Sequence, residues 1–159
     1  MGRPLDAVSA ILGICDRTTF EGEAAIALEA LATADDLQDY PVDIGFKDPM
    51  SVDFSPTILA ILNELADGVE TSRIATRFHN TVAAAIVGVV SKIALTTNIR
   101  DVAISGGVFQ NRFLTALVIN GLRGEGLDVY ANELVPCNDA GLSLGQAYIL
   151  RERIRAGIL

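Results

Sequence analysis

Cysteine and histidine are scarce in this sequence, which has 2 cysteines and 1 histidine among its 159 residues. Cys15 and Cys137 form no Cys-x-x-Cys pair and no disulfide framework of the secreted type, so we expect two reduced thiols in a cytoplasmic protein. The lone His79 gives no pair of histidines at the spacing of a metal site, and no Ser/His/Asp or Cys/His nucleophile arrangement emerges. We therefore expect a packed, structural role for His79.

Basic clusters and long apolar runs are also missing. The 12 lysines and arginines are scattered and the net charge is -8, which argues against a nucleic-acid partner. The most apolar run, Val82 to Val90, is shorter than the roughly 20 residues that a membrane span needs, so we expect no membrane partner. Charged residues make up only 20% of the chain while half is apolar, which predicts an apolar surface that a partner covers.

The length fits one domain or one lobe, and the first two thirds predict helices. Apolar spacing indicates helices over residues 4–13, 21–34, 55–68 and 72–95. We expect Ser55 and Ser72 to cap the last two, with Pro56 in the first turn of helix 55–68. Helix 72–95 is apolar around most of its girth after Val82, so that half should be deeply buried. Residues 35–56 suit an edge hairpin or a long loop.

The last third of the sequence changes its pattern. It predicts a strand at 101–105, a helix at 110–123, a strand at 127–131 and a closing helix at 139–155. Strand, helix, strand and helix in this order indicate a parallel βα unit. The fold class that we expect is therefore α/β, helix-rich, with a small βα sheet at the C-terminal end.

Two glycines follow the first predicted strand directly. Gly106 and Gly107 would let the backbone approach a ligand closely and direct free N–H groups at a phosphate or an adenosine. The pair matches neither a full G-x-G-x-x-G nor a Walker loop, so a tight turn without a ligand stays an equal alternative. Asn111, one helical turn further on, adds a side chain that both donates and accepts hydrogen bonds.

A second polar element, Asn138-Asp139, follows the second predicted strand. The spacing alone favours a helix cap, in which either side chain accepts from the N–H groups of helix 139–155. The functional alternative gives Asp139 a divalent cation, with further ligands from elsewhere. The acids Asp6 and Glu23 have a similarly plain explanation, because acids in a first turn complement the helix dipole.

Five segments nevertheless resemble one family when they are taken together and in order. They are RPLDAVSAILGICD (3–16), FEGEAA (20–25), RFHNTVA (77–83), SGGVFQNRFL (105–114) and PCNDAGLSLGQA (136–147). The family that they resemble is HypF, the carbamoyltransferases of hydrogenase maturation. The resemblance covers nearly the whole chain and is weakest over 35–56.

The resemblance implies that residues 1–159 are the C-terminal lobe of a TsaD-like carbamoyltransferase domain with the actin-like, sugar-kinase-like ATPase fold. Proteins of this family form carbamoyl-adenylate from carbamoyl phosphate and ATP. They pass the carbamoyl group to the C-terminal cysteine of HypE, on the route to the cyanide ligands of nickel–iron hydrogenase. The expected partners are thus a HypE-like acceptor and the missing N-terminal lobe of the same domain.

The resemblance also implies a binding site. It assigns nucleotide contacts to Asp6, Gly22, Glu23, Gly106, Gly107 and Asn111, and a divalent metal (Mg, Zn or Fe) to Asp139. The family's metal site also needs a His-x-x-x-His pair from the preceding lobe, so we expect this chain to be inactive alone. Two alternatives stay open: a non-catalytic module that docks a missing lobe or self-associates, and a lobe of a related O-carbamoyltransferase or tRNA threonylcarbamoyltransferase.

Overall fold

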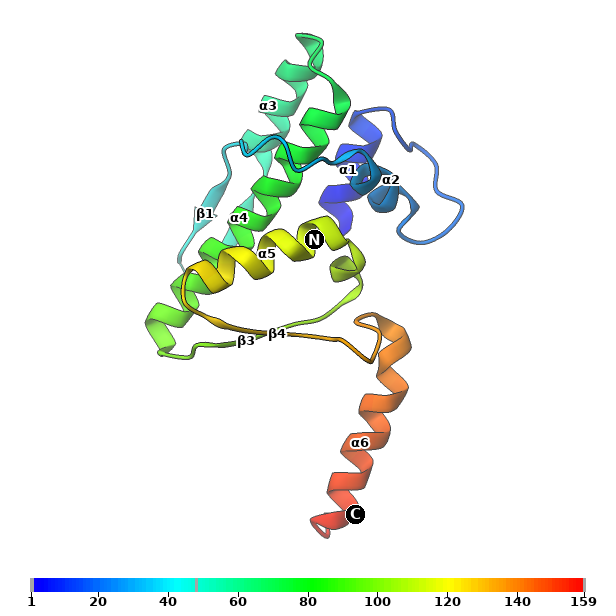
Figure 1. The fold of residues 1–159 in the computed structure, drawn as a ribbon, viewed down its shortest axis with the longest axis vertical. Helices are drawn as coiled ribbons and strands as arrows, with labels where there is room; N and C mark the ends of the chain where they lie inside the picture. Colours follow the sequence, from blue (N-terminus) through cyan, green and yellow to red (C-terminus); the bar gives the residue numbers. More distant parts are fainter. Residues whose placement is uncertain (1, 48, 159) are drawn as a thin grey trace.

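A computed structural model describes residues 2–47 and 49–158, and these form a mostly helical α/β unit with two small sheets (Figure 1). The elements are α1 (Gly2–Ile11), α2 (Glu23–Leu31), β1 (Asp43–Gly45), β2 (Ser51–Asp53), α3 (Ser55–Ala66), α4 (Thr71–Thr97), β3 (Asp101–Ile104), the 3-10 turn η1 (Gly107–Gln110), α5 (Arg112–Gly124), β4 (Asp128–Ala131), the 3-10 turn η2 (Asp139–Gly141) and α6 (Leu142–Arg155).

Helix α4 is the central element, and α2, α3 and α5 all pack against it. Its first half places Ile74, Phe78 and Val82 on one buried stripe at the spacing of an amphipathic helix. This stripe joins one core with apolar residues of the other helices: Leu5, Val8, Leu28, Ile61, Leu114, Val118 and Leu122. The position of α4 therefore sets where α2, α3 and α5 lie.

Two threonines of α4 fix the long loop between α2 and β1. The hydroxyl oxygen of Thr76 accepts the Thr33 N–H at 2.8 Å, and that of Thr81 accepts the Tyr40 N–H at 2.8 Å. Each hydroxyl also donates to the carbonyl four residues earlier in α4. Both threonine hydroxyls are therefore hydrogen-bonded as donor and as acceptor. The loop is consequently tied to the core helix at both ends.

A partly buried ion-pair network ties the same loop to α3. Arg77 of α4 donates from Nε to Asp36 at 2.8 Å and from a terminal nitrogen to Glu64 of α3. The hydroxyl of Tyr40 donates to the second carboxylate oxygen of Glu64 at 2.5 Å. Because a network holds one guanidinium with two carboxylates, each pair costs less side-chain entropy than an isolated surface pair would.

The sheets match the predicted connections. Strands β1 and β2 pair antiparallel with Ile44 opposite Val52, which is the hairpin expected within 35–56. Strands β3 and β4 pair parallel with Val102 opposite Val129, and α5 connects them. The predicted βα unit at the C-terminal end and the α/β class are thus confirmed.

The predicted helix ends were less accurate. Helix α1 begins at Gly2, which moves Asp6 out of the first turn. Asp53, and not Ser55, supplies the acceptor before α3, since its carboxylate accepts from the Ser55 N–H and hydroxyl. Ser72 lies inside α4, whose start has no side-chain cap. The local sequence offers several possible caps within two residues of each helix start, and tertiary packing determines which of them is used.

The predicted deep burial of α4 after Val82 is wrong. Its buried residues end at Ala85, and from Ile86 onwards every residue is half-buried or exposed, with Leu95 83% exposed. By length and composition alone α4 could span a membrane, contrary to the expectation from its apolar run. Its first half nevertheless forms the shared core with α2, α3 and α5, as the central helix of a folded unit does.

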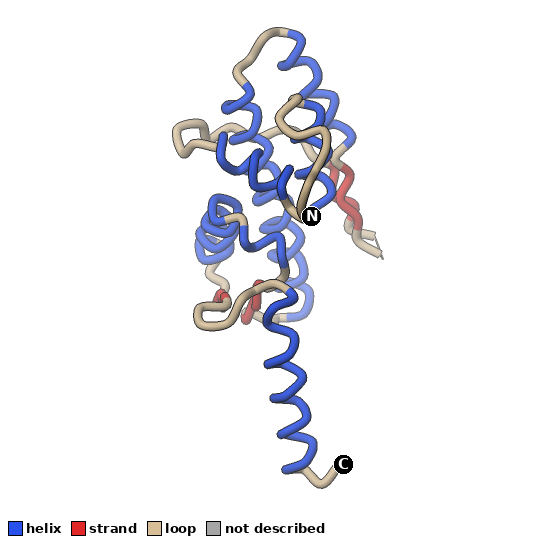
Figure 2. Tube along the Cα trace, turned by 90° about the vertical axis from the view of Figure 1, so that its right-hand side faces the viewer, coloured by secondary structure: helices blue, strands red, loops and turns tan. Residues whose placement is uncertain are grey.

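Helix α6 extends away from the body of the molecule in two views at right angles (Figures 1 and 2). None of its residues is buried, although Leu142, Tyr148, Ile149 and Ile154 are large and apolar. A helix with apolar residues around its girth is normally covered. The structure therefore contains the apolar surface that the composition predicts, and places it on α6.

A close contact between α4 and α5 yields a stability test. A Cβ at Gly121 would lie 2.7 Å from Cγ2 of Val87, whereas one at Gly124, in the same helix, would meet nothing within 4 Å. Val is stiff in a helix, so Gly121→Ala should overpack the contact and lower the free energy of unfolding by about 1–3 kcal/mol. Gly124→Ala should leave the free energy unchanged or raise it by up to about 1 kcal/mol. Urea unfolding measures both, and equal effects would mean that the helices are not this close.

Candidate functional site

The glycine loop, residues 105–111, is held against the loop that precedes η2. The Gly106 N–H donates to the carbonyl of Cys137 at 2.7 Å, and the Ser105 hydroxyl donates to the same carbonyl at 3.3 Å. Gly106 has φ of 110°, which a side chain would strain, so glycine is needed to make this turn. The two polar elements predicted from sequence therefore lie together at the carboxyl ends of β3 and β4.

The loop leaves backbone donors free. Within the described part of the chain, the N–H groups of Gly107 and Val108 have no protein acceptor, while those of Phe109 and Asn111 bond within the loop. Gly107 is exposed, so a ligand can approach it. These are the donors that a loop of this kind offers to an oxygen-rich ligand.

The N-terminus of α5, in contrast, is closed by protein groups. The carboxylate oxygen Oε1 of Glu29 accepts the N–H of Arg112 at 2.7 Å and that of Phe113 at 3.2 Å. The Leu114 N–H donates to Oδ1 of Asn111 at 2.8 Å. The first three N–H groups of the helix are thus satisfied internally, and a carboxylate already occupies the place of an anion.

His79 fixes the other side of Asn111. Its Nδ1–H donates to the Ala75 carbonyl at 2.7 Å, so Nε2 is the acceptor for the Asn111 amide at 2.9 Å. The ring is buried and meets Phe113 edge-on at 5.5 Å between centroids. Burial lowers the pKa of His79, outweighing the opposite effects of the Ala75 carbonyl and of Glu29. The structural role expected for this histidine is confirmed.

Both polar atoms of the Asn111 side chain are therefore used within the protein, and only 6% of the residue is exposed. Its predicted contact with a nucleotide stays a prediction. The structure gives Asn111 a definite function of its own, which is to cap α5 and to join it to α4.

Three other predicted nucleotide residues lie within α1 and around the start of α2. Asp6 is exposed on α1, and Gly22, in a left-handed conformation, precedes α2. Glu23 accepts from the Thr19 N–H and hydroxyl, and the backbone bond lowers the pKa of its carboxyl. No bond in the described part of the chain links these three residues to the glycine loop, so their predicted contacts also stay predictions.

Asp139 lies in η2 and is exposed, and Asn138 is the residue that caps this turn, through Oδ1 and the Ala140 N–H. Among residues 2–47 and 49–158, no three His, Cys, Asp or Glu side chains gather as a metal site. A cation at Asp139 would need ligands from another chain or segment.

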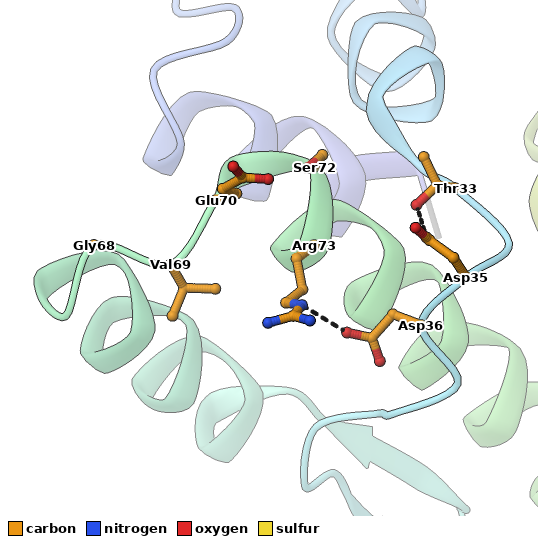
Figure 3. Close-up of a pocket in the computed structure, with 8 residues that line it drawn as sticks. All are labelled: Thr33, Asp35, Asp36, Gly68, Val69, Glu70, Ser72 and Arg73. Atoms are coloured by element: carbon orange, nitrogen blue, oxygen red, sulfur yellow. Dashed lines mark hydrogen bonds and ion pairs between the residues drawn. The ribbon is translucent and has the colours of Figure 1, made fainter.

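A polar pocket of about 420 Å³ lies elsewhere, between the loop after α2 and the start of α4 (Figure 3). Its lining includes Asp35, Asp36 and Glu70, and Arg73 is the one basic residue among the lining residues. That guanidinium is paired with Asp36 at 3.2 Å. An acidic pocket with a neutralised cation does not suit a phosphate, and it shares no residue with the glycine loop.

Comparison with known families identifies the family of this chain. The family described as "Carbamoyltransferase, Kae1-like Domain, second subdomain" matches residues 1–146. This chain belongs to that family. The predicted resemblance to HypF is therefore confirmed, and the subdomain match ends within α6.

Individual relatives agree with the family match. The carbamoyltransferase HypF of Synechocystis is 37% identical over 92% of this chain, and a HypF homologue of Cupriavidus necator is 38% identical over 99%. A crystal structure of full-length HypF in a phosphate- and nucleotide-bound form superposes with a TM-score of 0.89, at 40% identity over 96% of this chain. The chain spans 18% of the Synechocystis protein, 41% of the Cupriavidus one and 20% of the crystallised chain.

Glu29 is the residue of this subdomain's site that sequence reasoning missed. It lies within the Ala- and Leu-rich α2, 83 residues before Arg112, so nothing local connects it with the glycine loop. The only hint in the sequence is that Glu29 has no basic residue at helical spacing within α2. Packing of α2 and α5 against the same helix, α4, brings it to its partners.

The histidine geometry predicts a pH response. Because the pKa of His79 lies below its ordinary 6.5 in the folded chain, the unfolded chain takes up the proton first as the pH falls. His79 therefore does not lower stability above about pH 6.5 and destabilises the fold progressively below it. Protonation would also set an Nε2–H against the Asn111 amide donor, which costs the hydrogen bond.

Nitrogen-detected NMR of the ring can measure this, since His79 is the only histidine and its signals need no assignment. At pH 7.5 we expect a protonated Nδ1 and a bare Nε2, with a titration midpoint below 6.5. A midpoint at or above 6.5, or a proton on Nε2, would contradict the buried arrangement.

Proposed function

We propose that this chain is one wall of an ATP-dependent carbamoyl-transfer site, and that the intact domain has the actin-like fold. The observation that carries the proposal is the glycine loop, which presents the free N–H groups of Gly107 and Val108 beside the Cys137–Asp139 segment. The family membership and the phosphate- and nucleotide-bound form of the similar HypF support a nucleotide as the ligand.

The proposed reaction is the one named for the relatives, transfer of a carbamoyl group. Carbamoyl phosphate would supply the group, ATP would activate it as carbamoyl-adenylate, and a HypE-like C-terminal cysteine would accept it. The glycine loop would hold the nucleotide by backbone donors, which need no side-chain reorganisation when charge develops.

A divalent metal would act at Asp139, where it would neutralise phosphate charge. One exposed carboxylate does not hold a cation alone, and the described residues form no group of three metal-ligating side chains. The remaining ligands would come from the first subdomain of the same domain. Activity therefore requires both subdomains.

The exposed helix α6 supports the same conclusion. Its apolar residues, from Leu142 to Ile154, lie outside the body of the molecule, and none of them is buried. We assign their cover to the first subdomain. The alternative function, a module that pairs with itself, has the same observation in its favour, and the mass of the purified chain by light scattering distinguishes the two.

A chimaera tests the proposal directly. Residues 1–159 replace the matching segment of the Synechocystis relative, and carbamoyl-phosphate-dependent exchange between ATP and pyrophosphate is measured. We expect exchange by the chimaera and none by the isolated chain. Gly106→Ala should lower the exchange at least about tenfold, because a Cβ at φ of 110° costs about 1–3 kcal/mol or moves the loop.

Gly124→Ala, at the far end of α5 and without a positive φ, is the matched control and should keep the exchange within about twofold. A folded chimaera that shows no exchange would refute the proposal. So would robust exchange by the isolated 159-residue chain, since the site would then be complete without the first subdomain.

A further inference from the structure

Glu29 reaches from α2 to the glycine-loop end of α5, and no part of the proposed chemistry uses it. Its Oε1 atom accepts two consecutive N–H groups, from Arg112 and Phe113, across 83 and 84 residues of sequence. A carboxylate at the first turn of a helix also complements the helix dipole. These bonds place a charge-assisted contact directly after the loop that is proposed to hold the nucleotide.

The loop itself has few other supports. At its start, the Gly106 N–H and the Ser105 hydroxyl share the Cys137 carbonyl. At its end, the Thr115 hydroxyl donates to the Phe109 carbonyl at 3.0 Å, and Asn111 is held by His79. The two hydrogen bonds to the Glu29 carboxylate are therefore a large share of the contacts that fix the direction in which η1 enters α5.

We infer that Glu29 is a positioning residue for nucleotide binding, which acts by holding the first turn of α5 and thereby aiming the free N–H groups of Gly107 and Val108. The inference rests on the proposed function for the identity of the ligand. It also implies that the phosphates do not bind at the N-terminus of α5, since the Glu29 carboxylate would repel them there.

Two substitutions separate the geometry from the charge. Glu29→Gln keeps an oxygen acceptor for the two N–H groups and removes the charge, whereas Glu29→Ala removes both. Glu125→Ala is the matched control, because Glu125 is an exposed acid at the opposite end of α5. All three are made in the 159-residue chain and in the chimaera with the Synechocystis relative.

In the isolated chain, amide NMR and hydrogen exchange report the loop without any nucleotide. Glu29→Ala should shift the Gly107 and Val108 amide signals and speed exchange at Arg112 and Phe113 at least about tenfold, by loss of their acceptor. Glu29→Gln should keep the amide signals and the exchange rates close to those of the unmodified chain. Glu125→Ala should change neither. Unchanged Gly107 and Val108 signals in Glu29→Ala would overturn the inference, as would a failure of Gln to restore them.

In the chimaera, Glu29→Ala should raise the KM for ATP about tenfold with kcat within about threefold, and Glu29→Gln should recover most of the KM. A purely structural role would reduce the amount of active enzyme and leave the KM unchanged, which would also overturn the inference. If the unmodified chimaera shows no exchange, the proposed function fails, and the amide signals of the isolated chain still decide whether Glu29 aims the loop.

Discussion

The hydrogen bond between His79 and Asn111 is the interaction on which the site depends. It is buried, it joins the core helix α4 to the start of α5, and it uses the one nitrogen of the ring that the Ala75 carbonyl leaves free. Unpaired polar atoms are costly at such a place, so each partner fixes the other's orientation. Because Asn111 also caps α5, the end of the glycine loop is positioned by the same core that positions α4.

This arrangement decides which donors a ligand can reach. Because a glycine pair precedes the helix, the sequence alone suggests that the N–H groups in the first turn of α5 could bind a ligand. Glu29 and Asn111 occupy them, and the free donors lie earlier, at Gly107 and Val108. The loop connects β3 to α5, and hydrogen bonds hold it at Gly106 by the Cys137 carbonyl and at Asn111 by His79.

The proposed function makes this unit one wall of a larger cleft. It spans about a fifth of the full-length HypF structure, and its last helix carries an apolar surface with no cover. The candidate metal position and the exposed helix both have fewer neighbouring groups than they need. Among residues 2–47 and 49–158, no metal-ligating group of three side chains forms at Asp139, and no residue of α6 is buried. The proposed function assigns both the further ligands and the cover to the first subdomain.

Sequence alone determined the local features of this protein. The spacing of apolar residues predicted the helices, and the order of strands and helices in the last third predicted the parallel βα unit. Five ordered segments indicated the family. These features depend on residues close together in the chain, where periodicity and motif carry the information. The tertiary structure alone decided that the second half of α4 is only partly buried, that Asn111 faces His79, and that Glu29 closes α5. Such pairings join residues tens of positions apart, and packing of the helices around one core, not local pattern, selects them.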